Sequence, residues 1–162
     1  MASHQPLLLF VLVIIATALD GLLAGASLDQ SIKQLPARRR MGVIAFSAYS
    51  RAADLGTGLI WYPVLGIGGA LLTVAAALVA LAQALPLSVA LPLYLAAVAS
   101  LAHSLATSRA APTLLRQRRI TGDEAALTHL FARFERWQTF RAILQAATFG
   151  LMLWALPAVV AF

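Results

Sequence analysis

The chain has 162 residues, of which 61% are hydrophobic and only 11% are charged. Soluble domains carry about 25% charged residues, so this composition excludes a soluble globular protein and predicts a single integral membrane domain over residues 1–162. The absence of cysteine excludes disulfides, thiolate metal sites and a cysteine nucleophile. The net charge of +6 does not indicate a nucleic-acid partner, because the basic residues lie between or beside apolar runs, where membrane topology explains them.

Four apolar runs predict membrane-spanning helices, and together they predict an all-α four-helix bundle. The first run follows a leader without Lys or Arg and is too long for the apolar part of a signal peptide, so we expect it to be retained. Gly66, Gly68 and Gly69 give the second run a flat face for close helix packing. The four runs cover residues 6–26, 59–84, 86–108 and 140–162.

The connection between the first two spans also carries a helix signal. After Leu35-Pro36, the stretch 37–55 has a helix-permissive composition with a basic triplet at its start. We expect a helix there that lies at the cytoplasmic interface or packs on the protruding part of the last helix.

The stretch Thr121–Leu156 predicts one long helix that begins in water and ends in the membrane. Thr121 and Glu124 have the spacing of a capping box, and Pro157 is expected to weaken or end the helix. At 1.5 Å per residue the helix would be about 50 Å long, whereas the hydrocarbon core is about 30 Å thick. Its first half is therefore expected to protrude into the cytoplasm.

The Lys and Arg residues predict the orientation of the chain. Five lie in the connection between spans 1 and 2, seven lie in or beside the connection between spans 3 and 4, and none lies at the opposite ends. The positive-inside rule then places both connections in the cytoplasm and both termini outside, as in a multi-pass protein of the inner (plasma) membrane.

Three ionisable residues are predicted to share one level in the cytoplasmic half of the bundle: Asp20, His103 and Arg141. A carboxylate inside a span costs about 2.5–3.5 kcal/mol on insertion scales, so Asp20 should face the bundle interior and have a partner. One interpretation is a structural Asp20–Arg141 ion pair. The other is a cleft in which all three residues contribute chemistry.

Neighbouring residues would complete such a cleft. Ser104 and Gln145 continue the polar stripes of their helices at three- and four-residue steps. Trp61, Tyr62 and Trp137 would roof the cleft, although an aromatic belt at the membrane surface explains them as well. His103 also has a purely structural interpretation, in which its imidazole hydrogen-bonds to a neighbouring helix.

Metal and cofactor sites have no support in the sequence. A single histidine within the spans excludes bis-histidine haem ligation, and no cluster has the ligands of a three- or four-coordinate metal site. Glycine-rich phosphate loops, nucleophile elbows and HExxH motifs do not occur either. We therefore predict no metal and no cofactor.

Three short motifs give the layout a family resemblance. They are Leu35-Pro36 after the first span, Tyr62-Pro63 at the start of the second, and Trp137-x-x-x-Arg141 before the last. With these motifs, residues 7–156 resemble the anthrone-oxygenase-like family of small four-span membrane proteins. Most bacterial members have no known function, and fungal relatives are linked to oxidation of anthrones without a metal or flavin. The family often has Asn just before the Arg, where this chain has Thr139 and Phe140.

The leading functional hypothesis is a cytoplasm-facing pocket that binds a small apolar or aromatic molecule. The resemblance implies oxidation of that molecule by O2, with His103 or Asp20 as the base and Arg141 holding the oxyanion. The aromatic residues at 61, 62 and 137 would stack on its ring.

Two other classes stay open. A proton-coupled transporter is suggested by the carboxylate in span 1, which resembles that of the small multidrug exporters, although their dual topology conflicts with the twelve-to-zero charge bias. The third class is a scaffold subunit whose protruding helices bind a partner. The lipid bilayer is an expected partner in every case, and homo-oligomer formation is left open.

Overall fold

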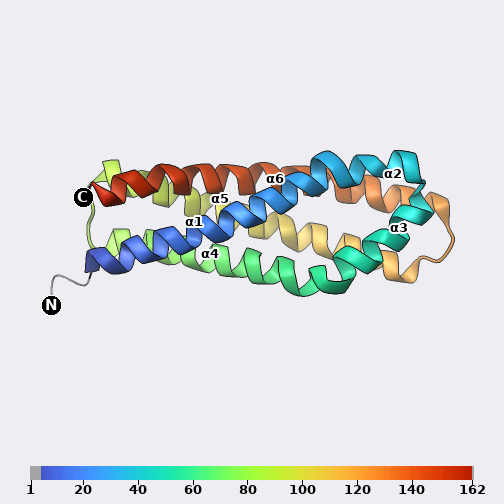
Figure 1. Ribbon diagram of the computed structural model, residues 1–162, viewed down its shortest axis with the longest axis horizontal. Coiled ribbons are helices and arrows are strands. Elements are labelled where there is room, and N and C mark those ends of the chain that lie inside the picture. The colour runs from blue at the N-terminus through green and yellow to red at the C-terminus, as the bar shows by residue number, and fades with distance from the viewer. Residues whose placement is uncertain (1–4, 162) are drawn as a thin grey trace.

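The computed structural model describes residues 5–161, and every regular element in that range is helical. This confirms the prediction of an all-α four-helix bundle. Four continuous helical segments are long and apolar enough to cross a membrane, so the chain is a multi-pass integral membrane protein. The long helices are α1 (Gln5–Asp29), α4 (Gly58–Ala82), α5 (Leu87–Leu115) and α6 (Glu124–Val160), and the short ones are α2 (Leu35–Met41) and α3 (Val43–Ala52) (Figure 1).

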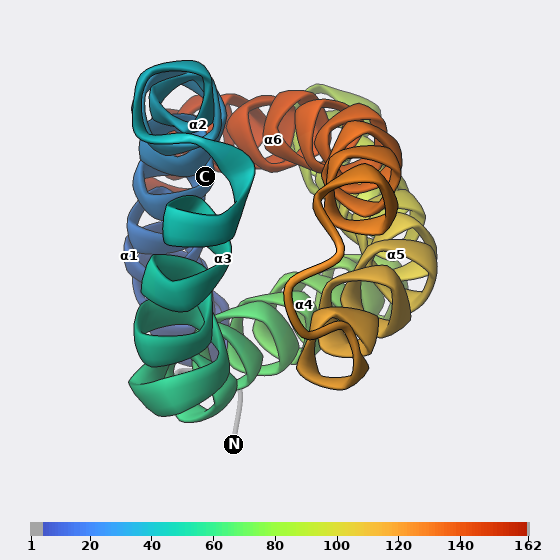
Figure 2. The same ribbon diagram turned by 90° about the vertical axis from the view of Figure 1, so that its right-hand side faces the viewer.

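The four long helices form a closed ring when viewed along the bundle (Figure 2). In this ring α1 contacts α4 and α6, and α5 contacts the same two helices from the other side. The tight link between α4 and α5 lies at the end where α1 starts and α6 stops (Figure 1). The opposite end holds α2, α3 and the connection from α5 to α6.

The first connection folds as a helical hairpin, so the prediction of one helix over residues 37–55 is wrong in its bounds. α1 runs through a π-helical turn, Gln30–Gln34, directly into α2. Pro36 does not end this helix because it follows a turn in which the hydrogen-bond register has already shifted. The chain reverses at Gly42, whose φ of +82° favours glycine. α3 then leads into α4 through a second π-helical turn, Ala53–Thr57.

The last helix is as long as predicted, but both of its ends differ from the prediction. Its N-cap is Asp123, whose carboxylate accepts a hydrogen bond from the N–H of Ala126 (2.9 Å). The predicted cap at Thr121 is wrong because Gly122, with φ of +73°, turns the chain before the helix begins. At the other end α6 passes through Pro157 without stopping. Its 37 residues correspond to about 55 Å.

Two apolar clusters divide the bundle along its length. The apolar half contains the α4–α5 link, and its core is built from small and aliphatic residues, among them Leu9, Val13, Ala76, Ala80, Leu93, Ala96 and Met152. The hairpin half contains α2 and α3, and its core is built from larger side chains, among them Leu35, Phe46, Leu127, Phe131 and Phe134.

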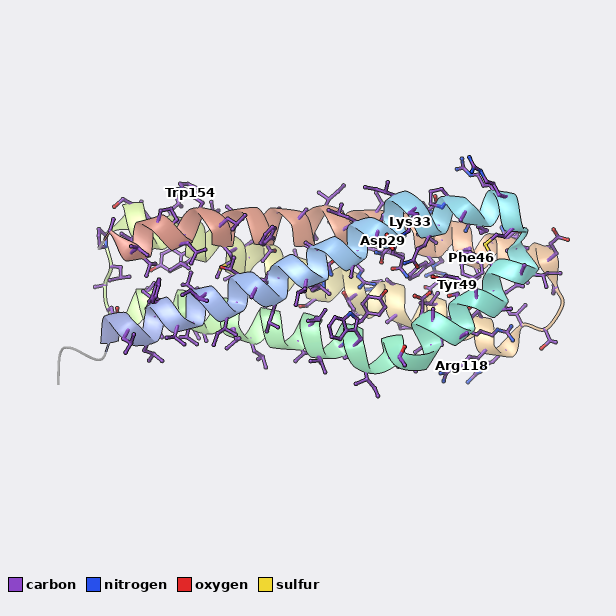
Figure 3. The ribbon with its side chains drawn as sticks, viewed as in Figure 1. Asp29, Lys33, Phe46, Tyr49, Arg118 and Trp154 are labelled. Carbon is purple, nitrogen blue, oxygen red and sulfur yellow. The ribbon has the colours of Figure 1, made fainter. Side chains whose placement is uncertain are left out.

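Aromatic contacts and an ion pair hold the hairpin half together. Phe46 of α3 meets Phe131 of α6 edge to face, with ring centroids 5.0 Å apart. Arg38 of α2 donates to Glu135 of α6 at 2.8 Å. Figure 3 shows Phe46 and Tyr49 at this end of the bundle and Trp154 at the other.

Candidate functional site

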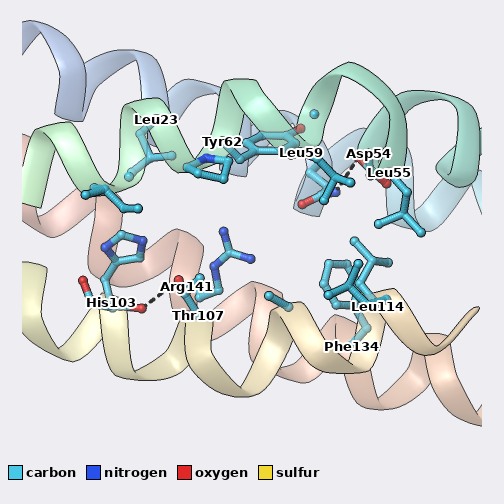
Figure 4. Close-up of a pocket in the computed structure, with 18 residues that line it drawn as sticks. Leu23, Asp54, Leu55, Leu59, Tyr62, His103, Thr107, Leu114, Phe134 and Arg141 are labelled. Atoms are coloured by element: carbon cyan, nitrogen blue, oxygen red, sulfur yellow. Dashed lines mark hydrogen bonds between the residues drawn. The ribbon is translucent and has the colours of Figure 1, made fainter.

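A cavity of about 320 Å³ lies within the hairpin half of the bundle (Figure 4). Its walls come from all four long helices and from the two π-helical turns, and they are mainly apolar. Four of the residues singled out in the sequence line it: Tyr62, His103, Ser104 and Arg141. The tertiary structure thus brings residues of α4, α5 and α6 to one space.

Two glycines of α4, which have no side chain, help to keep this cavity open. Gly58 and Gly66 both line the cavity. A Cβ built on Gly66 would lie 3.9 Å from Leu23 and 4.0 Å from Cε1 of His103, which are ordinary contact distances. A larger side chain at this position would therefore extend into the cavity beside the imidazole.

Among residues 5–161, Arg141 is the only Lys or Arg that lines the cavity, and it extends from α6 into the space (Figure 4). The residue is only 9% exposed. Among residues 5–161, its side chain makes no ion pair and no hydrogen bond, and its Nε is buried without a partner. A buried cation without a counter-charge is costly, so this position favours an anionic or strongly polarised oxygen.

His103 lies on α5 and is 5% exposed. It shares the cavity with Arg141, and Figure 4 shows both side chains directed into the same space. The hydroxyl of Thr107, which also lines the cavity, donates to the backbone carbonyl of His103 (2.9 Å). Tyr62 on α4 adds a half-buried aromatic ring to the lining.

Asp54 lies at the hairpin end of the cavity, and the sequence analysis did not identify it as a site residue. Its carboxylate accepts hydrogen bonds from Gln30 (3.1 Å) and from the Ser50 hydroxyl (2.6 Å). One sequence signal could have indicated a buried carboxylate here. Ser50 and Asp54 are four residues apart on a helix, just before the glycines at the start of the second span.

A hydrogen-bond network holds this carboxylate in place. Gln117, after α5, donates to the Ser50 hydroxyl (3.1 Å) and accepts from the Ser47 hydroxyl (3.2 Å). Arg51 donates to the backbone carbonyls of Gln117 (2.7 Å) and Ile120. The network joins α3 to the α5–α6 connection at the end of the cavity where Asp54 lies.

Asp20 lies outside the cavity lining, and the predicted Asp20–Arg141 ion pair is wrong. The carboxylate instead accepts a hydrogen bond from the Thr73 hydroxyl of α4 at 2.8 Å. A Cβ on Gly69 would come within 2.6 Å of Oδ1 of Asp20, so this glycine allows the close approach. Equal depth in the bundle did not imply contact, because Asp20 faces α4 whereas Arg141 points into the cavity.

Three further residues predicted at the site lie elsewhere. Trp61 is on the outer surface of α4 and is 51% exposed. Trp137 lies in a separate surface groove with Arg133, Arg136 and Phe140. Gln145 is buried one turn beyond Arg141, and neither atom of its amide has a hydrogen-bond partner among the described residues. Of the aromatic residues expected to roof the cleft, Tyr62 alone lines the cavity.

Metal ligands do not gather in this part of the chain. Within residues 5–161, no three His, Asp or Glu side chains lie close enough together to hold a metal ion. The polar side-chain groups that the described residues offer at the cavity are a guanidinium, an imidazole, a phenol, a carboxylate, a carboxamide and hydroxyls.

Comparisons with known proteins found no protein-family model, no curated protein and no solved structure that matches this chain. The resemblance to the anthrone-oxygenase-like family therefore stays a prediction. What is established is the class: a four-helix, multi-pass integral membrane protein.

Proposed function

We propose that this protein binds a small, mostly apolar molecule that carries an acidic or anionic oxygen, and that Arg141 contacts this oxygen. The observation that supports the proposal most directly is the Arg141 side chain, buried in an apolar-walled cavity with no carboxylate of the described residues within ion-pair distance. A bound oxyanion would supply the missing partner through charge-assisted hydrogen bonds.

Asp54, the other charged residue of the cavity, determines which end of the ligand lies beside Arg141. Asp54 lies toward the hairpin end, so an anion there would meet a like charge. The acidic end of the ligand should therefore lie beside Arg141 and His103. Its apolar body can contact Tyr62 and Phe134, which offer aromatic surface to the same space.

Oxidation of the ligand is a second candidate function, and the shared location of His103 and Arg141 favours it. In such a reaction His103 would remove a proton from an acidic C–H or phenol, and Arg141 would hold the resulting oxyanion. The carbanion would then form a C–O bond with O2, which is the oxidant, and take back a proton to give a hydroperoxide; cleavage of the O–O bond with loss of water would leave the ketone, as the family resemblance implies. Asp20 has no place in this scheme, because it lies outside the cavity lining.

The proposed orientation points the hairpin half toward the cytoplasmic side of the membrane. All twelve Lys and Arg residues lie toward this half, and the helix ends around the α4–α5 link carry none. This distribution supports an orientation with both chain ends on the outer face of an inner (plasma) membrane.

The binding proposal is tested with 2-naphthoate and its uncharged analogue 2-naphthamide. Titration calorimetry on the detergent-purified protein should show naphthoate binding that weakens about 30-fold or more in Arg141→Gln, since truncating one partner of a buried charge pair costs about 2–5 kcal/mol. Naphthamide binding should change little. Arg136→Gln, an exposed residue on the same helix, is the control. Unchanged naphthoate affinity in Arg141→Gln would overturn the proposal.

A further inference from the structure

The cavity reaches the molecular surface on one side. Its lining residues from α1, α6 and the two π-helical turns are all buried. Every exposed lining residue belongs to α4 or α5: Leu59, Pro63 and Ile67 on α4, and Ser104 and Leu115 on α5. The opening therefore lies between these two helices, and we refer to it as the α4–α5 portal.

The same two helices pack differently in the two halves of the bundle. In the apolar half, Ala76 and Ala80 of α4 share a core with Val89 and Leu93 of α5. At the portal, α4 instead presents Gly66 to the cavity, and no side chain from this position fills the space between the helices. A side opening in the hairpin half is thus compatible with firm packing of the pair elsewhere.

Toward the apolar half, the surface around the portal is mainly apolar on both helices, whereas Ser108 and Arg109 of α5 are exposed toward the hairpin end. On α4, Ile60 is 73% exposed and Val64 is 59% exposed. On α5, Leu101 and Leu105 face outward in the same way, with Leu105 72% exposed. Exposed apolar surface of this kind on a spanning helix is in contact with lipid. The portal therefore opens toward the hydrocarbon of the bilayer.

We propose that the ligand is a single-chain amphiphile that enters sideways from the membrane through the α4–α5 portal. This inference rests on the proposed function: the acidic head lies at Arg141, and the chain passes between Leu59 or Ile67 and Ser104 into the lipid. A long-chain carboxylic acid has this chemistry. Because the chain leaves through the portal, the cavity volume sets no upper limit on its length.

The experiment uses the lack of cysteine in the natural chain. Ser104→Cys places one thiol at the portal, and Leu105→Cys places one on the next, lipid-facing residue outside the cavity lining. Both variants are reconstituted in phosphatidylcholine nanodiscs and labelled with N-(1-pyrenyl)maleimide. Binding of hexadecanoate and of 2-naphthoate is then measured for each labelled protein and for Arg141→Gln.

We expect hexadecanoate binding to weaken at least about tenfold in labelled Ser104→Cys. A pyrene that displaces about two methylene groups of the chain from the portal would cause a loss of this size. Labelled Leu105→Cys should bind as the wild type does, and Arg141→Gln should lose binding. Gly66→Leu should block both probes by filling the cavity, since its Cβ fits without a clash. Gly150→Leu, where a Cβ meets nothing within 4 Å, controls for the added side chain.

The outcomes separate this inference from the proposed function. If hexadecanoate binds equally well to both labelled variants while Arg141→Gln abolishes binding, entry through the portal is overturned and the anion site stands. A phospholipid found in the Arg141-dependent site by native mass spectrometry would overturn the assignment of a single-chain ligand. If the wild type binds neither hexadecanoate nor 2-naphthoate, the proposed function itself is overturned.

Discussion

The apolar half and the hairpin half of this bundle use the same four helices in different ways. In the apolar half, small side chains such as Ala76, Ala80 and Ala96 are fully buried at 0% exposure, and the helices approach closely. In the hairpin half, larger aromatic side chains and an added helical hairpin surround a cavity of about 320 Å³. The apolar half is thus tightly packed, whereas the hairpin half contains the cavity and the unpaired Arg141.

Buried polar residues lie between the two halves and serve different purposes. Asp20 and Thr73 satisfy each other by a direct hydrogen bond between α1 and α4. Arg141 and Gln145, on α6, keep polar atoms without a partner among the described residues. The first pair is explained by helix packing alone, whereas unsatisfied groups beside a cavity indicate a site.

Truncating a large side chain in the apolar half should lower the free energy of unfolding more than any other change considered. Leu93 is 0% exposed, and Leu93→Ala should lower the free energy of unfolding by about 2–5 kcal/mol. Leu114→Ala, on the same helix but lining the cavity, should cost less than half as much because its side chain already borders empty space. Denaturant unfolding in detergent gives both values. Equal losses would contradict the difference in packing.

Removing the unpaired cation should stabilise the fold. The sequence interpretation, with an Asp20–Arg141 ion pair, predicts a loss of stability for Arg141→Gln. The structure predicts a gain of at least about 1 kcal/mol, because a buried group without a partner carries its full desolvation penalty. The measurement is the melting temperature without added ligand, compared with Arg136→Gln. A lower melting temperature would mean that Arg141 has a counter-charge in the folded protein.

The buried amide of Gln145 should behave in the same way with a smaller effect. Gln145→Leu keeps the side-chain size and removes two unsatisfied atoms, so it should raise stability by up to about 1 kcal/mol. Gln138→Leu is the control, since Nε2 of Gln138 donates to the backbone carbonyl of Ser27 (3.3 Å) and the variant loses that bond, although Oε1 of Gln138 has no partner among the described residues. If both variants destabilise equally, Gln145 is satisfied by a group such as bound water.

The smallest expected effect is the coupling between Asp20 and Arg141. In a double-mutant cycle with Asp20→Asn and Arg141→Gln, the two changes in stability should add to within about 0.5 kcal/mol, because the side chains do not meet. The Arg38–Glu135 pair, at 2.8 Å, is the positive control for the same measurement. Partial recovery in the double mutant would restore the ion pair that the sequence suggested.

Much of this protein was determined by its sequence alone. Hydropathy and charge are local properties, so the membrane class, the four spans, the long last helix and the one-sided Lys and Arg distribution could all be predicted. Depth along a span follows from counting residues at a fixed rise, which is why Asp20, His103 and Arg141 could be predicted to share one level; two of them, His103 and Arg141, line one cavity.

The tertiary structure alone decided which of these residues meet. Side-chain direction around a helix axis depends on how each helix is rotated against its neighbours, and that rotation is set by packing. Asp20 consequently faces Thr73, Trp137 packs half-buried against the hairpin core at a separate surface groove, and only Tyr62 of the predicted aromatic residues lines the cavity. Asp54 joins the site only because the chain reverses at Gly42 and α3 returns along the bundle. Contacts of this kind depend on the packing of several helices, so no local pattern in the sequence predicts them.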